Sequence, residues 1–307
     1  MSVAATDASL GLRRRRARVV RRFAGEKVAL AALAVLVAVL LAGALAPQLA
    51  PQGPDSINLS DLWRNHPPVL SGWHVLGTDN IGRDVLVRTL YGIHNTEEAA
   101  LLAGLAATLI GILVGALAGY LGGWADAILM RLADLVTAFP TLMVLYAAFV
   151  FLQPVGTGTA TIIFALYLWT FVARVVRAHI ASLRELEFVQ AARALGASNA
   201  RILLRHLLPN TAGTALVAAT SVVGQIVLLE ATVEFLGLGV PSEVRPTLGN
   251  LLGDAAMSGI GINNQLGLGW WVWATPAIAL VLILASLNLL GDALDTALNP
   301  TAPTGRA

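Results

Sequence analysis

Long stretches without charged residues recur along the chain, and several are long enough to cross a bilayer as a helix, which takes about 20 residues. One stretch is about twice that length, and Gln153, Pro154, Gly156 and Gly158 interrupt it, which predicts two helices joined by a tight turn. The predicted spans are Val28–Ala46, Ala99–Ala125, Leu135–Ala173 (two spans), Ala212–Leu238 and Trp271–Leu290. The pattern therefore predicts an all-α polytopic membrane protein with six transmembrane helices.

Composition agrees with this pattern, because 57% of the 307 residues are hydrophobic and only 12% are charged. Charged residues make up about 25% of an ordinary soluble domain. The sequence contains no cysteine, which excludes disulfides, zinc–thiolate sites and cysteine nucleophiles. The chain is thus a membrane protein by composition alone, and its redox compartment stays undetermined.

Lysine and arginine are distributed unevenly, and their positions predict the orientation in the cell (inner or plasma) membrane. Basic residues near helix ends favour the cytoplasmic side. With the amino terminus inside, the inner segments hold sixteen of the 20 basic residues, seven of them arginines within 13–22. Both termini are therefore predicted to be cytoplasmic. The predicted segments are a basic N-terminal segment 1–27, a first helix 28–46, an extracytoplasmic loop 47–98, a five-helix core 99–292 with a cytoplasmic loop 180–210 and an extracytoplasmic loop 239–270, and a cytoplasmic tail 293–307.

The amino-terminal region has a competing interpretation. Arginines, an apolar run and then Ala44-Leu45-Ala46 resemble a secretory leader with a small-residue cleavage site. The apolar run of 19 residues is longer than the central region of such leaders, which is roughly 7 to 15 residues long. A retained first transmembrane helix is therefore the favoured interpretation.

The cytoplasmic loop carries more charge than a simple connection requires. It contains "EFVQAARALGASNARILLRHLLPN" over residues 187–210. Gly196 can adopt the left-handed conformation that ends a helix, and Ser198 or Asn199 can cap a second short helix. Pro209 is expected to end that second helix. Two short helices at an angle predict a rigid cytoplasmic knob that binds a partner.

This loop resembles the coupling loop in permease subunits of binding-protein-dependent ABC importers. Their pattern is Glu-Ala-Ala, three residues, Gly, nine residues, Ile, one residue and Leu-Pro. Here residues 190–192 read Gln-Ala-Ala, followed at the family spacing by Gly196 and by Leu-Pro at 208–209. Gln190 replaces the glutamate and His206 the isoleucine, and the first change removes the charge with which the family's glutamate could form an ion pair to the ATPase subunit.

Further stretches resemble dipeptide and oligopeptide permeases of the second-subunit type. They are "GTDNIGRDVLVR" at 77–88, "AGYLGGWADAILMRLADLVTAFP" at 118–140, "LEATVEFLGLG" at 229–239 and "NLLGDALDTALNP" at 288–300. The departures from the family are "GIHNTEEAA" at 92–100 and, in the last outer loop, "PSEVRPTLGN" at 241–250 and "GINNQLGLG" at 261–269. The family signature in the first outer loop comprises Gly77, Thr78, Asp79, Gly82, Arg83 and Asp84.

The resemblance implies a type I ABC importer permease fold, with this chain forming half of a translocation pore for di- or oligopeptides. The implied partners are a homologous permease subunit, two ABC ATPase subunits or domains and an extracytoplasmic peptide-binding protein, all at the lipid bilayer. ATPase docking is assigned to Glu187, Gln190, Ala191, Ala192, Arg193, Gly196, Arg201, Arg205 and Pro209. No nucleic-acid partner is expected.

The chain is not expected to be an enzyme. A phosphate-binding loop needs a lysine after its glycines, and the only lysine, Lys27, lies in "AGEKVAL". ATP and magnesium are therefore expected on the partner ATPases, with no cofactor or metal on this chain. The glycines of the second span, among them Gly111 and Gly115, are interpreted as helix-packing positions.

Two acidic residues in the fifth span are candidates for the translocation path or its gate. Glu230 and Glu234 are four residues apart, which places both on one helical face, and carboxylates in a membrane normally face a cavity or a partner. Glu230 matches the family motif, whereas Glu234 replaces a residue that is usually small. An interhelical hydrogen bond or pairing with the companion subunit is the alternative.

Two functional alternatives remain at the level of the sequence. A stand-alone proton-coupled carrier would use Glu230 or Glu234 as its proton site, although such carriers commonly contain an internal repeat and none is evident here. An ABC importer of another cargo, such as nickel or glutathione, would share the same permease motifs.

Overall fold

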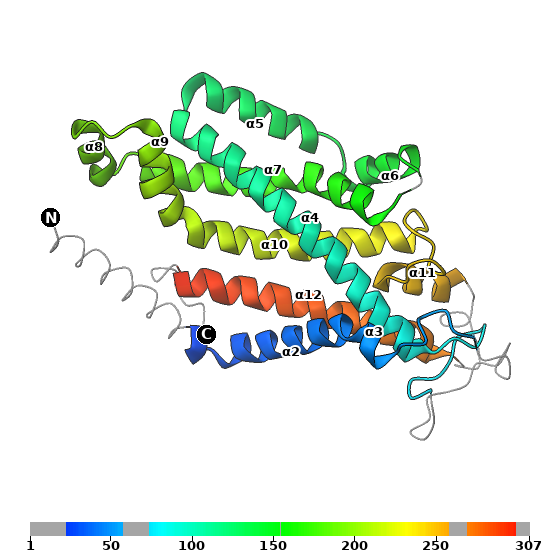
Figure 1. Cartoon of the computed structure of the whole chain (residues 1–307). Helices are drawn as coiled ribbons and strands as arrows, with labels where there is room; N and C mark the ends of the chain where they lie inside the picture. The colour runs from blue at the N-terminus through cyan, green and yellow to red at the C-terminus, as the bar shows by residue number, and fades with distance from the viewer. Residues whose placement is uncertain (1–22, 58–73, 154, 258–268, 299–307) are drawn as a thin grey trace, which may run out of the picture.

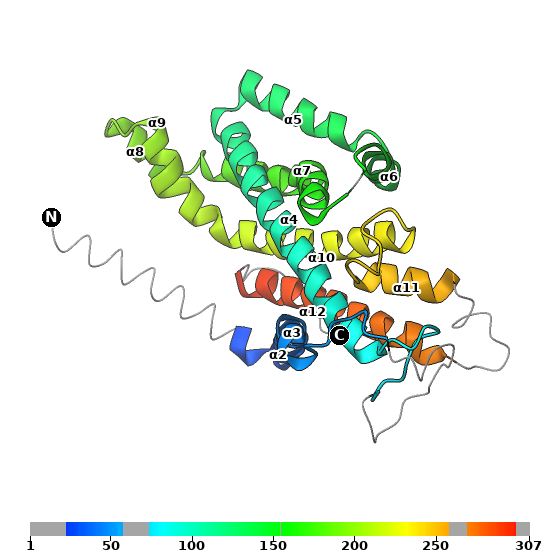
Figure 2. The same ribbon diagram turned by 45° about the vertical axis from the view of Figure 1, so that its right-hand side comes forward.

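The computed structural model describes residues 23–57, 74–153, 155–257 and 269–298. The basic segment up to residue 22, part of the first outer loop, most of "GINNQLGLG" and the end of the tail lie outside the described residues. Long helices run side by side in a bundle (Figures 1 and 2). The long helices are α2 (Lys27–Ala44), α4 (Val85–Leu121), α7 (Thr157–Leu183), α10 (Leu208–Phe235) and α12 (Trp270–Leu298). Apart from two isolated β-bridges, every regular element in the described residues is helical.

Five described helices are long and apolar enough to cross a membrane, and a bent pair brings the number to as many as six. The pair consists of α5 (Gly123–Thr137) and α6 (Thr141–Phe151), whose axes differ by 78°. Pro140 stands at the bend, where its missing N–H and its clash with the preceding turn end α5. The predicted third span, which began at Leu135, contains α6 and only the last turn of α5, so most of α5 lies before it.

Helix α4 begins earlier than predicted. It starts at Val85, whereas the apolar pattern placed the start of the second span at Ala99. The Asp84 side chain caps it by accepting a hydrogen bond from Val87 N, at 2.9 Å. The early start was missed because Glu97 and Glu98 interrupt the apolar pattern, although Glu97 is buried within the bundle.

Glycines of α4 bring this helix into close contact with α7. A Cβ at Gly111 would lie 2.5 Å from Val172 Cβ, and one at Gly119 would lie 2.6 Å from the Arg177 carbonyl oxygen. Such approaches require glycine, and they remove the gap that larger residues would hold open between helices. These contacts confirm the interpretation of the α4 glycines as packing positions.

The short helices gather at the two ends of the bundle. Helices α8 (Glu187–Ala194) and α9 (Asn199–Ile202) lie at one end, called the α8 end, while α3 (Ala46–Leu49) and α11 (Leu248–Met257) lie at the other, called the α11 end (Figures 1 and 2). The start of α2 and the end of α12 are also at the α8 end.

Pro209 does not end a helix, contrary to the expectation from sequence. A π-helical turn, η2 (Leu203–Leu207), joins α9 to α10, so the backbone is helical from Asn199 to Phe235. Proline is tolerated because it stands in the first turn of α10, directly after the widened turn. The Asn210 side chain donates a hydrogen bond to the His206 carbonyl, at 2.7 Å, and thereby satisfies one of the disturbed backbone groups.

Candidate functional site

The α8–α9 pair forms a compact corner at the end of the bundle. Gly196 has φ of +78°, the left-handed conformation expected from the sequence. Ala197 N donates to the Ala192 carbonyl, at 3.0 Å, and Gly196 N to the Arg193 carbonyl, at 2.9 Å, which together make a Schellman motif. The Ser198 hydroxyl then caps α9 by accepting from Arg201 N, at 3.4 Å. The corner is therefore fixed by backbone geometry on both sides.

Three side chains fasten this corner to the bundle. Val189 of α8 and Ile202 of α9 are fully buried in the hydrophobic core. Tyr120, at the end of α4, donates a hydrogen bond to the Asn199 side chain, at 2.8 Å, and the Arg193 guanidinium lies 5.7 Å from its ring centroid. Sequence reasoning missed Tyr120, because nothing in the local pattern of α4 links it to residues about 75 positions later.

The predicted docking residues are presented to solvent around this anchored corner. Ala192 is half-buried, and the others are exposed, namely Glu187, Gln190, Ala191, Arg193, Gly196, Arg201, Arg205 and Pro209. Leu195 is 87% exposed at the tip, so an apolar side chain projects there among charged ones. A projecting surface of charged and apolar side chains on a rigid corner is suited to contact another protein.

A groove lined by apolar and several polar side chains lies at the bend between α5 and α6. Its volume is about 610 Å³, and α7 and α10 supply its other walls. Tyr167 of α7 lines the groove and donates a hydrogen bond to the Thr141 hydroxyl, at 3.0 Å. Arg174 donates to the Thr137 hydroxyl at 2.8 Å and lies 3.2 Å from the Asp134 carboxylate. Polar groups in an apolar chain mark a cavity or a pathway.

Sequence reasoning missed this groove because its residues are dispersed. It is lined by Thr137, Ala138, Phe139, Pro140, Thr141, Tyr167, Leu168, Thr170, Phe171, Arg174, Gln225, Leu228 and Leu229. Only Pro140, within the family-like stretch at 118–140, could have indicated a bend there. The groove is formed when that bend is placed against α7 and α10.

Glu230 and Glu234 lie on a different side of α10 from this groove. A helix turns about 100° per residue, so both carboxylates point away from the face that carries Gln225 and Leu228. They are 3% and 7% exposed. In this structure the pair faces the interior of the subunit, and its place on the translocation path or its gate stays a prediction.

The two carboxylates contact neighbouring elements at the α11 end. Thr96 of α4 lies next to Glu230, and the Val240 backbone just beyond α10 lies next to Glu234. Thr96 accepts from Leu248 N at the start of α11, at 3.2 Å. The alternative, an interhelical hydrogen bond or pairing with the companion subunit, stays a prediction.

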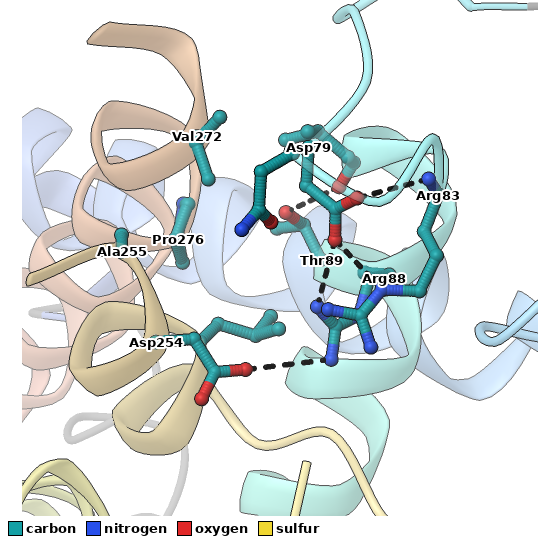
Figure 3. Close-up of a pocket in the computed structure, with 11 residues that line it drawn as sticks. Asp79, Arg83, Arg88, Thr89, Asp254, Ala255, Val272 and Pro276 are labelled. Carbon is teal, nitrogen blue, oxygen red and sulfur yellow. Dashed lines mark hydrogen bonds and ion pairs between the residues drawn. The ribbon is translucent and has the colours of Figure 1, made fainter. Parts of the chain in front are cut away.

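The signature loop forms a buried ionic network at the same end (Figure 3). Asp79 accepts from Arg83 Nε, at 2.7 Å, and from Arg88 Nη1, at 3.1 Å. Arg88 also lies 3.6 Å from the Asp254 carboxylate of α11. Sequence reasoning indicated Asp79 and Arg83 but missed Arg88 and Asp254, which join this loop to the second outer loop.

Backbone features shape the rest of the signature. Gly77 and Gly82 both have positive φ, at 78° and 86°. The Thr78 carbonyl accepts from Trp271 Nε1 of α12, at 3.0 Å, and Asp84 caps α4 and pairs with His74 Nδ1, at 2.8 Å. The signature therefore ties the first loop to the starts of α4 and α12.

Comparison with known proteins shows the family to which the chain belongs. The family described as binding-protein-dependent transport system inner membrane component matches residues 111–302, more than half of the chain. The chain belongs to this family. A second family model, described as the N-terminal TM domain of oligopeptide transport permease C, matches residues 15–68 of this permease.

Relatives of the permease align along almost its whole length. A Mycobacterium bovis protein named oligopeptide transport system permease protein OppC is 35% identical over 294 residues, 94% of this chain and 95% of the relative. A Brucella suis protein, provisionally named a peptide permease, is 36% identical over 288 residues, 93% of this chain and 91% of the relative.

A solved structure shows the fold of the permease. A chain of the inward-facing MetNI methionine ABC transporter aligns with a TM-score of 0.54 at 21% identity, covering 70% of this chain and 96% of that chain. The protein is accordingly a multi-pass membrane permease with an ABC importer permease fold, and a transport component rather than a catalyst.

Proposed function

We propose that this permease is the transmembrane subunit of an ATP-driven importer and forms half of a translocation path for di- or oligopeptides. Relatives named for peptide and oligopeptide transport support the cargo class. The observation that carries the mechanism is the rigid, exposed α8–α9 corner, which projects from a bundle that has no ATP-binding motif of its own.

The corner is proposed to dock on an ABC ATPase subunit, so the α8 end is cytoplasmic together with both chain termini. ATP and magnesium then belong to two ATPase subunits or domains. Closure of the ATPases moves the docked corner, and because the corner is fastened to α4 and continuous with α10, the displacement reaches both long helices. A rigid element of this kind transmits motion between two discrete states.

The groove at the α5–α6 bend is proposed as one wall of the path. A homologous permease subunit provides the opposite wall. Threonine and tyrosine hydroxyls and the Gln225 amide in this wall can exchange hydrogen bonds with peptide groups that leave water.

The α11 end is proposed to face an extracytoplasmic peptide-binding protein that delivers cargo. The buried pair Glu230 and Glu234 lies beneath this surface, and we assign it to the outer gate rather than to the wall of the open groove. Peptide contact with the pair therefore requires that the segment above it move.

Co-purification tests the proposed assembly. The tagged chain is purified in mild detergent from its native membrane, and every co-purifying protein is identified by mass spectrometry. A homologous permease and ABC ATPases in stoichiometric amounts are expected, followed by ATP-dependent peptide uptake in proteoliposomes supplied with the accompanying binding protein. A chain that purifies alone and monodisperse would contradict the proposal and favour a stand-alone carrier.

A further inference from the structure

A short segment between α10 and α11, residues 240–247, lies against one face of α4 and is called the strap. Asn95 Nδ2 donates to the Pro246 carbonyl, at 2.6 Å, and Arg245 Nη2 donates to Glu98 Oε2, at 2.7 Å. The strap belongs to one of the stretches that depart from the family pattern, and Asn95 and Glu98 belong to another. Two stretches about 150 residues apart, both departures from the family pattern, therefore form one structural unit.

The strap covers a small cavity that contains unsatisfied acidic groups. Glu230 and Glu234 line it together with Arg245, Thr247 and apolar side chains of α6 and α7. Glu230 Oε2 and Glu234 Oε2 are both buried and have no hydrogen-bond partner in the described part of the chain. A buried acceptor without a partner is costly, so these two oxygens leave room for a further donor.

Charge around this cavity is unbalanced. Arg245 is the one cation among the described residues that line it, beside Glu230 and Glu234, and its Nη2 is bonded to Glu98 outside the lining. Two carboxylates of the cavity thus lie near a guanidinium whose ion pair is with a third. The side chain of Arg245 is 20% exposed, and it reaches the cavity from the strap.

The strap has few apolar anchors to hold it in place. Val244, beside Arg245, is 76% exposed, and Glu243 is exposed as well. Its attachment to α4 is polar and includes, besides the contacts from Asn95 and Glu98, a hydrogen bond from Arg88 to the Ser242 carbonyl, at 3.4 Å. Hydrogen bonds also join it to Asn250 and Asp254 of α11. Water can replace polar contacts of this kind when the strap lifts. The arrangement is that of an acidic site closed by a cation of the same chain.

We propose that Arg245 is an internal occupant of an acidic site made by Glu98, Glu230 and Glu234, and that this site receives a cationic group of the cargo, a guanidinium or a primary ammonium, when the strap lifts. The built-in guanidinium identifies the ligand chemistry, since charge-assisted bonds to carboxylate favour such groups. The inference rests on the proposed function, because the cargo reaches the site only during import.

Paired peptides test the site. The reconstituted complex with its binding protein is supplied with Ala-Arg-Ala or with Ala-citrulline-Ala, which replaces the guanidinium by a neutral group of similar shape. The wild type is expected to import the arginine peptide preferentially. Glu230→Gln is expected to reduce that preference by about tenfold, the effect of losing a hydrogen bond to a charged group, while uptake of the citrulline peptide remains.

The matched control is Glu243→Gln, which removes an exposed carboxylate from the same strap outside the cavity and is expected to leave the preference unchanged. A preference unaltered by Glu230→Gln would overturn the inference but leave the proposed function intact. Failure of the wild-type complex to import either peptide would overturn both.

Movement of the strap can be measured without comparing two cargo peptides. The chain has no native cysteine, so an introduced pair of cysteines can be cross-linked specifically. Asn95→Cys with Pro246→Cys places two thiols across the contact. Oxidation is expected to cross-link them in the nucleotide-free complex, to abolish uptake until a reductant is added, and to become inefficient when the complex is trapped with ATP and vanadate. Full uptake by the cross-linked protein would show that the strap does not lift and would reject the proposal.

Discussion

At the scale of single residues, Gly196 is needed for the shape of the α8–α9 corner and not for packing against other residues. A Cβ there would meet no atom within 4 Å, so only the backbone conformation, with φ of +78°, requires glycine. A β-branched residue in this conformation costs about 1–2 kcal/mol. That cost falls on the corner alone, because Gly196 is exposed and an added Cβ would contact no other residue.

We therefore expect Gly196→Val to insert and assemble normally but to uncouple ATP hydrolysis from transport. The measurement compares peptide-stimulated ATPase activity with uptake in the same proteoliposomes. Gly158→Val is the control, since Gly158 also has open space around it but no positive φ. Normal uptake by the Gly196 variant would refute the role of the corner.

Gly111 differs from Gly196, because a lack of space for a side chain, and not the backbone conformation, requires glycine there. A side chain there would collide with Val172 of α7. We expect Gly111→Leu to destabilise the helix pair by about 1–3 kcal/mol, the usual cost of overpacking, and to lower the detergent melting temperature. Gly156→Ala, at a position with open space, should leave the melting temperature unchanged. Equal stability of both variants would indicate that α4 and α7 can separate.

At the scale of elements, α4 unites both ends of the molecule. Its first turns hold the signature loop and the strap through Arg88, Asn95 and Glu98, and its last turn holds the α8–α9 corner through Tyr120. The apolar pattern predicted the middle of this helix correctly. It could not predict the first four turns, because Glu97 and Glu98 resemble a loop until their burial and partners are known.

The cap of α4 should be sensitive to the chemistry of residue 84. Asp84→Ala removes the acceptor for Val87 N and the partner of His74, and we expect a loss of about 1 kcal/mol, typical of an N-cap. Asp84→Asn retains an acceptor and should recover most of that stability. Thermal unfolding in detergent measures both variants, and identical losses would show that the charge rather than the cap matters.

Helix α10 shows which features of a helix the sequence pattern predicts and which need the packed structure. Spacing of four correctly placed Glu230 and Glu234 on one face, yet only the packed structure shows which direction that face points. Pro209 misled the prediction in a similar way, because a local rule for proline does not anticipate a widened turn that accommodates it. The groove at the α5–α6 bend required three separate segments and was not predictable from any one of them.

At the scale of the whole molecule, the ends of the bundle carry different chemistry. The projecting corner and both described ends of the chain share one end, whereas the ionic network, the strap and α11 share the other (Figures 1 and 2). The distribution of basic residues predicts which end is cytoplasmic. This prediction concerns the protein in its membrane and can be tested there.

Single cysteines in this cysteine-free chain should report the orientation. Ser56→Cys, near the α11 end, is expected to react with a membrane-impermeant thiol reagent added to intact cells. Ala200→Cys, in α9, should react only after the membrane is opened, and both residues replaced are exposed. The reverse pattern of labelling would require an inverted topology.

The π-helical turn at Leu203–Leu207 has a mechanical consequence. It contains one residue more than an α-helical turn would hold, and each residue advances an α-helix by about 100°. The turn therefore sets the angle between the docking corner and the face of α10 that lines the groove. Deleting one of its residues would turn the corner by about that angle relative to α10 and would remove Val189 and Ile202 from their places in the hydrophobic core.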